Sequence, residues 1–130
     1  MDESVQHSPL GIHLLAELYE CPKSRLSDSD WLDSKLVAAA NEAGATVINS
    51  SFHQFSPQGV SGVVIIAESH ITIHTWPEIG YAALDVFTCG RPELTNSITE
   101  QIVKQLEAES VKYNKVKRGI LPNPALMPQP

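Results

Sequence analysis

The sequence has few of the features that mark secreted, membrane-spanning or nucleic-acid-binding chains. Only two of its 130 residues are cysteine, Cys21 and Cys89. Two cysteines do not make a disulfide framework, and they predict free thiols in a reducing, cytoplasmic setting. No apolar run approaches the ~20 residues that cross a bilayer, and we expect no signal peptide because no basic segment precedes an apolar one.

Positive charge is also scarce. Nine Lys and Arg stand against fifteen Asp and Glu, which gives a net charge of −6. A chain of this balance lacks the clustered positive charge that captures nucleic acid or anionic lipid, so we expect neither as a partner. The composition is otherwise that of one ordinary globular domain over residues 1–130. Residues 1–9 are polar, and residues 121–130 contain four prolines, so both ends are predicted to be flexible.

Hydrophobic patterning predicts strands and helices in alternation. Two helices are expected, over 31–43 and 94–108, because their apolar residues recur at helical spacing. Ser27 and Asp30 have the spacing of a capping box before the first helix. Alternating, β-branched or nearly continuous apolar segments predict six strands, and the segment 60–67 reads as fully buried. The predicted strands are 11–20, 45–52, 60–67, 71–76, 81–89 and 111–117.

This order of elements predicts an α+β fold. Short connections between the four middle strands favour antiparallel pairing. The expected architecture is a two-layer α/β sandwich, with a mainly antiparallel sheet and two helices on one of its faces. The other face of the sheet is then free for a partner, and apolar residues on both faces of the strands favour a dimer.

Reactive residue types are concentrated between Glu68 and Glu78, with Cys89 eleven residues further on. A metal site from His70 and His74 is disfavoured, because in an extended segment the two residues lie ~13 Å apart. A serine or cysteine nucleophile is a second interpretation, although Ser69 is not in a G-x-S-x-G motif. The third is structural, with sheet histidines and a buried thiol. The residues alone leave these alternatives open.

The segment E-S-H-I-T-I-H-T-W-P-E at 68–78, followed by F-T-C-G at 87–90, resembles the short prokaryotic S-adenosylmethionine decarboxylase proenzymes. The similarity includes F-H-Q-F at 52–55 and G-V-S-G at 59–62, and it extends over nearly the whole chain apart from its ends. The resemblance implies a self-processing enzyme that cleaves between Glu68 and Ser69. It would yield a β-chain of residues 1–68 and an α-chain of residues 69–130. Ser69 would become a covalent pyruvoyl group, with no metal and no pyridoxal phosphate.

Roles for further residues follow from the same resemblance. His74 corresponds to the histidine that takes the α-proton during processing, and Ser61 to a hydroxyl that supports it. Cys89 corresponds to the proton donor of decarboxylation, so Cys89→Ala is expected to cleave normally but to lose activity faster during turnover. Regular alternation would put Ser69 and His74 on opposite faces. Ser69 is therefore expected in a turn or bulge.

The resemblance also implies the substrate and its contacts. The pyruvoyl group would form a Schiff base with S-adenosylmethionine and accept electrons as CO₂ leaves. Phe55 and Trp76 would contact the adenine or the sulfonium, with core packing as the alternative. Glu78 would accept hydrogen bonds from the ribose. His70 receives no firm role, and Glu17 is read as a surface carboxylate.

Family members of this type are typically homodimers with sites at the interface. The product, decarboxylated S-adenosylmethionine, is the aminopropyl donor for spermidine synthesis. Two alternatives are kept: a pyruvoyl-dependent decarboxylase of ornithine or arginine on the same scaffold, and a non-catalytic regulatory paralogue. Intact Ser69, His74 and Cys89 argue against the paralogue.

Overall fold

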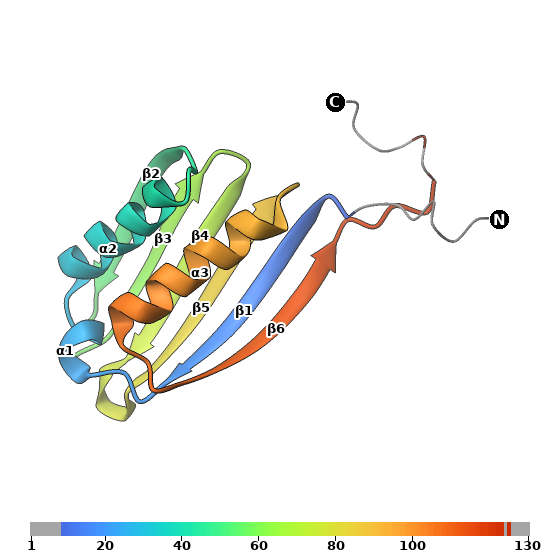
Figure 1. Cartoon of the computed structure of the whole chain (residues 1–130). Coiled ribbons are helices and arrows are strands. Elements are labelled where there is room, and N and C mark those ends of the chain that lie inside the picture. The colour runs from blue at the N-terminus through green and yellow to red at the C-terminus, as the bar shows by residue number, and fades with distance from the viewer. Residues whose placement is uncertain (1–8, 124, 126–130) are drawn as a thin grey trace.

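A computed structural model describes residues 9–123 and 125 of the chain (Figure 1). The predicted flexible ends lie mostly outside these residues. The predicted order of strands and helices is confirmed, with a short helix added after the first strand. The elements are β1 (Gly11–Tyr19), α1 (Lys23–Leu26), α2 (Ser29–Glu42), β2 (Val47–Gln54), β3 (Val60–Ile66), β4 (Ser69–Trp76), the 3₁₀ turn η1 (Pro77–Ile79), β5 (Tyr81–Cys89), α3 (Pro92–Leu106) and β6 (Ser110–Arg118).

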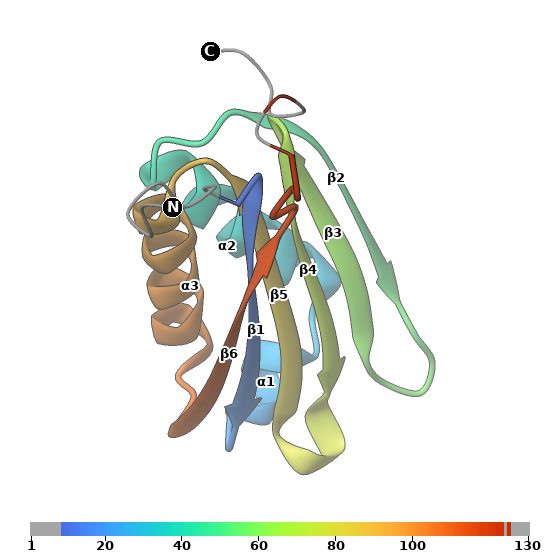
Figure 2. The same ribbon diagram turned by 90° about the vertical axis from the view of Figure 1, so that its right-hand side faces the viewer.

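The strands form one six-stranded sheet in the order β2-β3-β4-β5-β1-β6. Every neighbouring pair in it is antiparallel. Helices α2 and α3 cover one face of this sheet, and Figure 2 shows that none of the described helices lies on the opposite face. The predicted α+β two-layer sandwich is therefore confirmed, and the uncovered side, here called the open face, is available to a partner.

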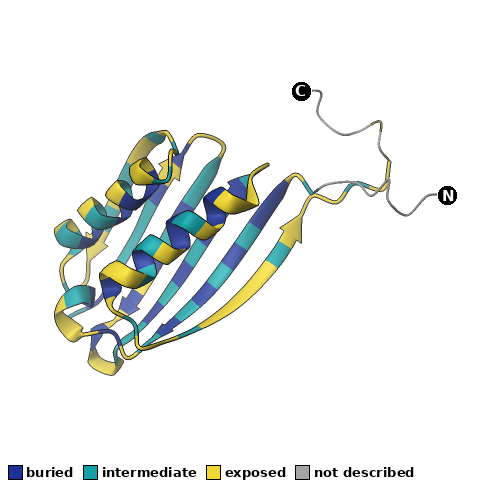
Figure 3. Ribbon diagram, viewed as in Figure 1, coloured by how far each residue is buried: buried dark blue, intermediate teal, exposed yellow. Residues whose placement is uncertain are grey.

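Burial alternates along the central strands, as Figure 3 shows. In β4, Ile71 and Ile73 are buried among the aliphatic residues under the helices, whereas His74 and Trp76 are exposed. Strand β3 follows the same rule, because Ile65 is 44% exposed between buried neighbours. The prediction that segment 60–67 is buried on both faces was wrong, since only one face of this sheet has a helical layer over it.

The start of α2 differs from the predicted capping box. Asp28 is the N-cap, and its side chain accepts hydrogen bonds from the backbone N–H groups of Asp30 and Trp31. Ser27 instead donates its hydroxyl hydrogen bond to the carbonyl of Lys23, at the start of α1. Helix α1 is only four residues long, too short to leave a periodic hydrophobic pattern, and this explains why the sequence did not predict it.

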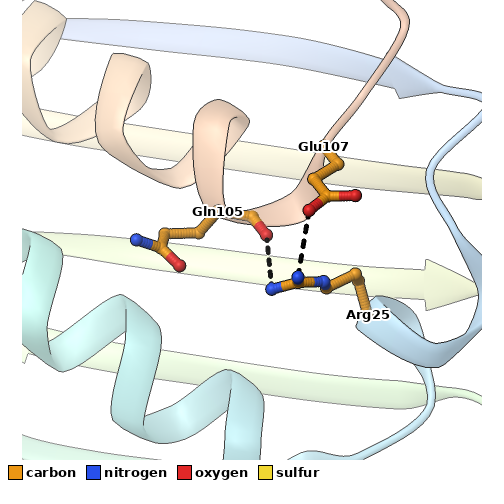
Figure 4. Close-up of polar contacts among 3 residues, drawn as sticks. All are labelled: Arg25, Gln105 and Glu107. Carbon is orange, nitrogen blue, oxygen red and sulfur yellow. Dashed lines mark hydrogen bonds and ion pairs between the residues drawn. The ribbon is translucent and has the colours of Figure 1, made fainter.

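Arg25 links α1 to the C-terminal end of α3 through hydrogen bonds (Figure 4). Its guanidinium donates to the Glu107 carboxylate at 2.9 Å and to the Gln105 carbonyl at 3.4 Å. The same guanidinium lies 5.0 Å from the Trp31 ring centroid. The pair is partly exposed, so its contribution is about 1 kcal/mol or less. These contacts fix the segment between β1 and α2 on the helical side and leave the open face untouched.

Candidate active site

The junction between Glu68 and Ser69 lies in the tight hairpin that joins β3 to β4. Ile66 and Ser69 are the last paired residues of the two strands, and Ala67 and Glu68 form the turn. Glu68 has a φ of 61°, in the left-handed region, which costs a residue other than glycine about 1 kcal/mol. Ser69 itself is the first residue of a regular strand, so the prediction of a turn or bulge at Ser69 was wrong. The irregular backbone lies one residue earlier.

Strand β5 brings Cys89 to this junction. The Cys89 backbone N–H donates to Ser69 Oγ at 3.2 Å, and the Cys89 thiol donates to the Glu68 carbonyl oxygen at 2.8 Å. That oxygen would gain negative charge if the neighbouring serine hydroxyl attacked the carbonyl carbon. A donor already aimed at it is what an oxyanion site requires. Glu68, Ser69 and Cys89 meet where β4 begins, and we call these three residues the cleavage end.

A second group of predicted residues lies at the other end of β4. Ser61 and His74 are direct partners across β3 and β4, and Ser61 Oγ lies 2.8 Å from His74 Nδ1. When the ring proton is on Nδ1, this N–H donates to Ser61 Oγ and leaves Nε2 unprotonated and directed away from Ser61, where it can accept a proton. Ser61 therefore fixes the orientation of an exposed imidazole.

Beside this pair is an open pocket with a volume of about 240 Å³. Phe55 and Trp76 form part of its wall and are 45% and 41% exposed, so neither is a core residue. Phe55 is held by a turn in which its N–H donates to the carbonyl of Gly59, a residue with a φ of 106°. The pocket is lined by Phe55, Gln58, Gly59, Val60, Ser61, His74, Thr75, Trp76 and Glu78. We call Phe55, Ser61, His74, Trp76 and Glu78 the binding end.

The two ends are separated within one chain. Ser69 and His74 are five residues apart on a regular strand, a distance of ~16 Å at ~3.3 Å per residue. The sequence placed both residues in one contiguous motif, and the structure shows that they do not meet in a single protomer. Each end therefore holds part of the predicted catalytic set.

The structure adds two open-face clusters that the sequence did not reveal. The Tyr81 hydroxyl donates to the carboxylate of Glu17 on β1, and burial together with this carboxylate raises the Tyr81 pKa to about 12. His70 packs near His13 and Phe87, and burial and then His13 lower its pKa while Asp85 opposes them. Glu17 and Tyr81 are 64 residues apart, and only the pairing of β1 with β5 brings them together.

The remaining thiol belongs to neither end. Cys21 is buried, and burial raises its pKa to about 11. Among residues 9–123 and 125, the acidic, histidine and cysteine side chains form no group of three or more that could hold a metal ion. Within the same residues no helix has the length and apolar character to span a bilayer.

Comparison with known proteins identifies the family. The family model for S-adenosylmethionine decarboxylase matches residues 12–119. The S-adenosylmethionine decarboxylase proenzyme of Caldicellulosiruptor saccharolyticus is 50% identical over 115 residues, which cover 88% of this chain and 93% of the relative. The proenzyme of Clostridium tetani is also 50% identical, over 88% of this chain and 91% of its own length.

A solved structure agrees with the sequence relatives. The crystal structure of the adenosylmethionine decarboxylase from Aquifex aeolicus superposes with a TM-score of 0.84 at 38% identity, covering 88% of this chain and 94% of the other. The fold is thus similar to that of a solved adenosylmethionine decarboxylase. The chain belongs to the S-adenosylmethionine decarboxylase family.

Proposed function

We propose that the chain cleaves its own Glu68–Ser69 bond and then, as a homodimer with shared sites, decarboxylates S-adenosylmethionine. The observation that carries this proposal is the hydrogen bond from the Cys89 thiol to the Glu68 carbonyl oxygen. This hydrogen bond places a donor on the carbonyl oxygen of the Glu68–Ser69 peptide bond. The neighbouring Ser69 side chain carries the hydroxyl that attacks this carbonyl. The named relatives are proenzymes, which agrees with such a cleavage.

The cleavage follows from the groups at this junction. Ser69 Oγ attacks the Glu68 carbonyl carbon, the C–N bond breaks, and an ester replaces the amide while the nitrogen takes the hydroxyl proton. The Cys89 thiol stabilises the oxyanion of the tetrahedral intermediate. The strained φ of Glu68 destabilises the starting amide relative to the ester. Removal of the Ser69 α-proton then expels the Glu68 carboxylate. Water releases ammonia from the dehydroalanine that remains, and residue 69 ends as a pyruvoyl group.

The base for the α-proton comes from a second copy of the chain. His74 of the same chain is ~16 Å away along β4, whereas two chains packed through their open faces, with their β4 strands antiparallel, bring the cleavage end of one to the binding end of the other. The partner subunit's His74, oriented by the partner's Ser61, then reaches the Ser69 α-proton. Histidine suits the step because it exchanges protons near neutral pH.

The pocket at the binding end supports the same dimer. Its volume of about 240 Å³ is below the roughly 300 Å³ at which pockets for drug-sized ligands begin. S-adenosylmethionine, with an adenine, a ribose and an amino acid, needs more space than this pocket offers within one protomer. The open face also exposes the apolar side chains of Ile65 and Trp76, which a partner would cover. A face-to-face dimer completes the pocket and removes this surface from water.

In the mature enzyme the pyruvoyl group supplies an electrophilic carbonyl that withdraws electrons from the substrate as CO₂ leaves. Phe55 and Trp76 hold the adenine and face the sulfonium cation, and Glu78 accepts hydrogen bonds from the ribose hydroxyls. Cys89 returns a proton to the former α-carbon from the side of the cleavage end. The product is the aminopropyl donor of spermidine synthesis.

Cys89→Ala is expected to slow self-cleavage about tenfold, the effect of losing one hydrogen bond of about 1.4 kcal/mol to the oxyanion. This revises the expectation of normal cleavage, which took no account of the bond to Glu68. The activity that remains should also decay faster during turnover, because protonation at the wrong carbon leaves the pyruvoyl group transaminated and the enzyme inactive. The measurement is the uncleaved fraction over time after synthesis, with Cys21→Ala as the matched control. A normal cleavage rate and a normal activity lifetime together would contradict both roles of Cys89.

Carboxyl-labelled S-adenosylmethionine tests the substrate. The purified protein should release labelled CO₂ from it and not from ornithine or arginine, because neither amino acid carries an adenine for Phe55 and Trp76. Phe55→Ala should weaken the reaction mainly through a higher KM, by about tenfold. Release from ornithine or arginine alone would overturn the assignment.

A further inference from the structure

Trp76 has an aromatic neighbour outside the pocket. The indole lines the pocket at the binding end, and the ring of Tyr81 packs against it with centroids 5.2 Å apart and planes tilted by 32°. Tyr81 does not line the pocket. The two residues are direct partners across β4 and β5, on either side of the turn η1 that carries Glu78. Tyr81 therefore supports a pocket wall without contacting the cavity.

Tyr81 is itself held from two directions by β1. Its hydroxyl donates to the carboxylate of Glu17, and the ring of Tyr19 stacks on it with centroids 5.7 Å apart and planes 26° from parallel. A ring packed on another ring and fixed by a charge-assisted hydrogen bond has little freedom to rotate. Glu17 thus determines where Tyr81 lies, and Tyr81 limits where the indole of Trp76 can lie.

We infer that Tyr81, held by Glu17, is a positioning residue that fixes the Trp76 indole for the adenine of the substrate. The inference rests on the proposed function, in which Trp76 contacts adenine. The indole is already 41% exposed. Without Tyr81 it has room to change rotamer, and each substrate molecule must order it on binding. The cost of that ordering falls on substrate binding and not on the chemistry at the cleavage end.

The kinetic test compares substitutions that keep or remove each contact. Tyr81→Leu removes the ring and should raise KM for S-adenosylmethionine about fivefold while kcat stays within about twofold. Glu17→Leu should raise KM about threefold, and Glu17→Gln, which keeps an acceptor for the hydroxyl, should restore it. Tyr113→Phe on β6 is the matched control and should change neither value. If Tyr81→Leu fails to fold, Tyr81→Phe and Glu17→Leu test the hydrogen bond separately.

A second readout needs no substrate. In a Trp31→Phe background, Trp76 is the only tryptophan, and its fluorescence anisotropy reports how freely the indole moves. Tyr81→Leu and Glu17→Leu should lower the anisotropy at unchanged particle size, and Glu17→Gln should not. Unchanged KM and unchanged anisotropy in folded, cleaved Tyr81→Leu would overturn the inference, and so would a loss confined to kcat. If the wild type releases no CO₂ from S-adenosylmethionine, the proposed function fails, whereas the anisotropy still decides whether Tyr81 holds Trp76.

Discussion

Ser69→Ala is expected to remain one uncleaved chain of full length and to lose decarboxylase activity by at least about four orders of magnitude. Alanine has no hydroxyl to attack the Glu68 carbonyl, so the ester never forms and no pyruvoyl group arises. The fold should survive, because the substitution removes only an acceptor for the Cys89 N–H, worth about 1 kcal/mol. Denaturing gel electrophoresis and CO₂ release measure the two effects.

Ser110→Ala is the matched control for this variant. Ser110 is exposed at the start of β6, far along the chain from the hairpin, and its loss should leave cleavage and activity at wild-type levels. Cleavage of Ser69→Ala at the same bond would show that another group attacks Glu68. An intact but active Ser69→Ala chain would show that the activity needs no pyruvoyl group. Either result would contradict the proposed chemistry.

Two variants with different defects, assayed at a substrate concentration near the wild-type KM, are expected to restore activity in a mixed dimer. Ser69→Ala lacks a working cleavage end, and a Phe55→Ala/Trp76→Ala double variant lacks a working binding end. If each site joins the cleavage end of one chain to the binding end of the other, a mixed dimer has one whole site and one doubly defective site. Its activity should be about half that of the wild type, because one site in two is complete.

The experiment uses co-expressed chains with different affinity tags, so that two purification steps isolate the mixed dimer. Ser61 and His74 are unchanged in both variants, and the double variant should therefore still be cleaved. The two parent dimers, purified in the same way, are the controls. Activity of the mixed dimer no higher than the mean of its parents would contradict the shared site, and so would failure to isolate any mixed dimer from chains that are each folded.

The sequence predicted the order of strands and the pairing of the middle hairpins because these depend on local patterns. Alternation in 71–76 and the turn signals around Gly59 and Gly80 are readable within a few residues. It misjudged segment 60–67, since a run of Val and Ile does not reveal whether one face or both will be covered. The sequence also did not predict α1. Its four residues make little more than one helical turn, which is too short for apolar residues to repeat at helical spacing.

The candidate site divides in the same way. The contiguous motif placed Ser69, His74 and Trp76 on one segment, but only three-dimensional pairing shows that Ser69 belongs with Cys89 and that His74 belongs with Ser61. The contiguous motif at 68–78 therefore contains residues of two separate half-sites, the cleavage end and the binding end. The contact of Tyr81 with Glu17 depends on β1 lying beside β5, a long-range pairing that no local pattern encodes.

The intact mass of the freshly purified wild-type protein tests the central claim most directly. Two fragments are expected, residues 1–68 with an ordinary C-terminal carboxylate and residues 69–130 lighter than a serine-ended fragment by the mass of one ammonia. That pair of masses requires both cleavage at Glu68 and conversion of Ser69. A single full-length mass from folded protein given ample time, or a C-terminal fragment that still begins with serine, would contradict the account.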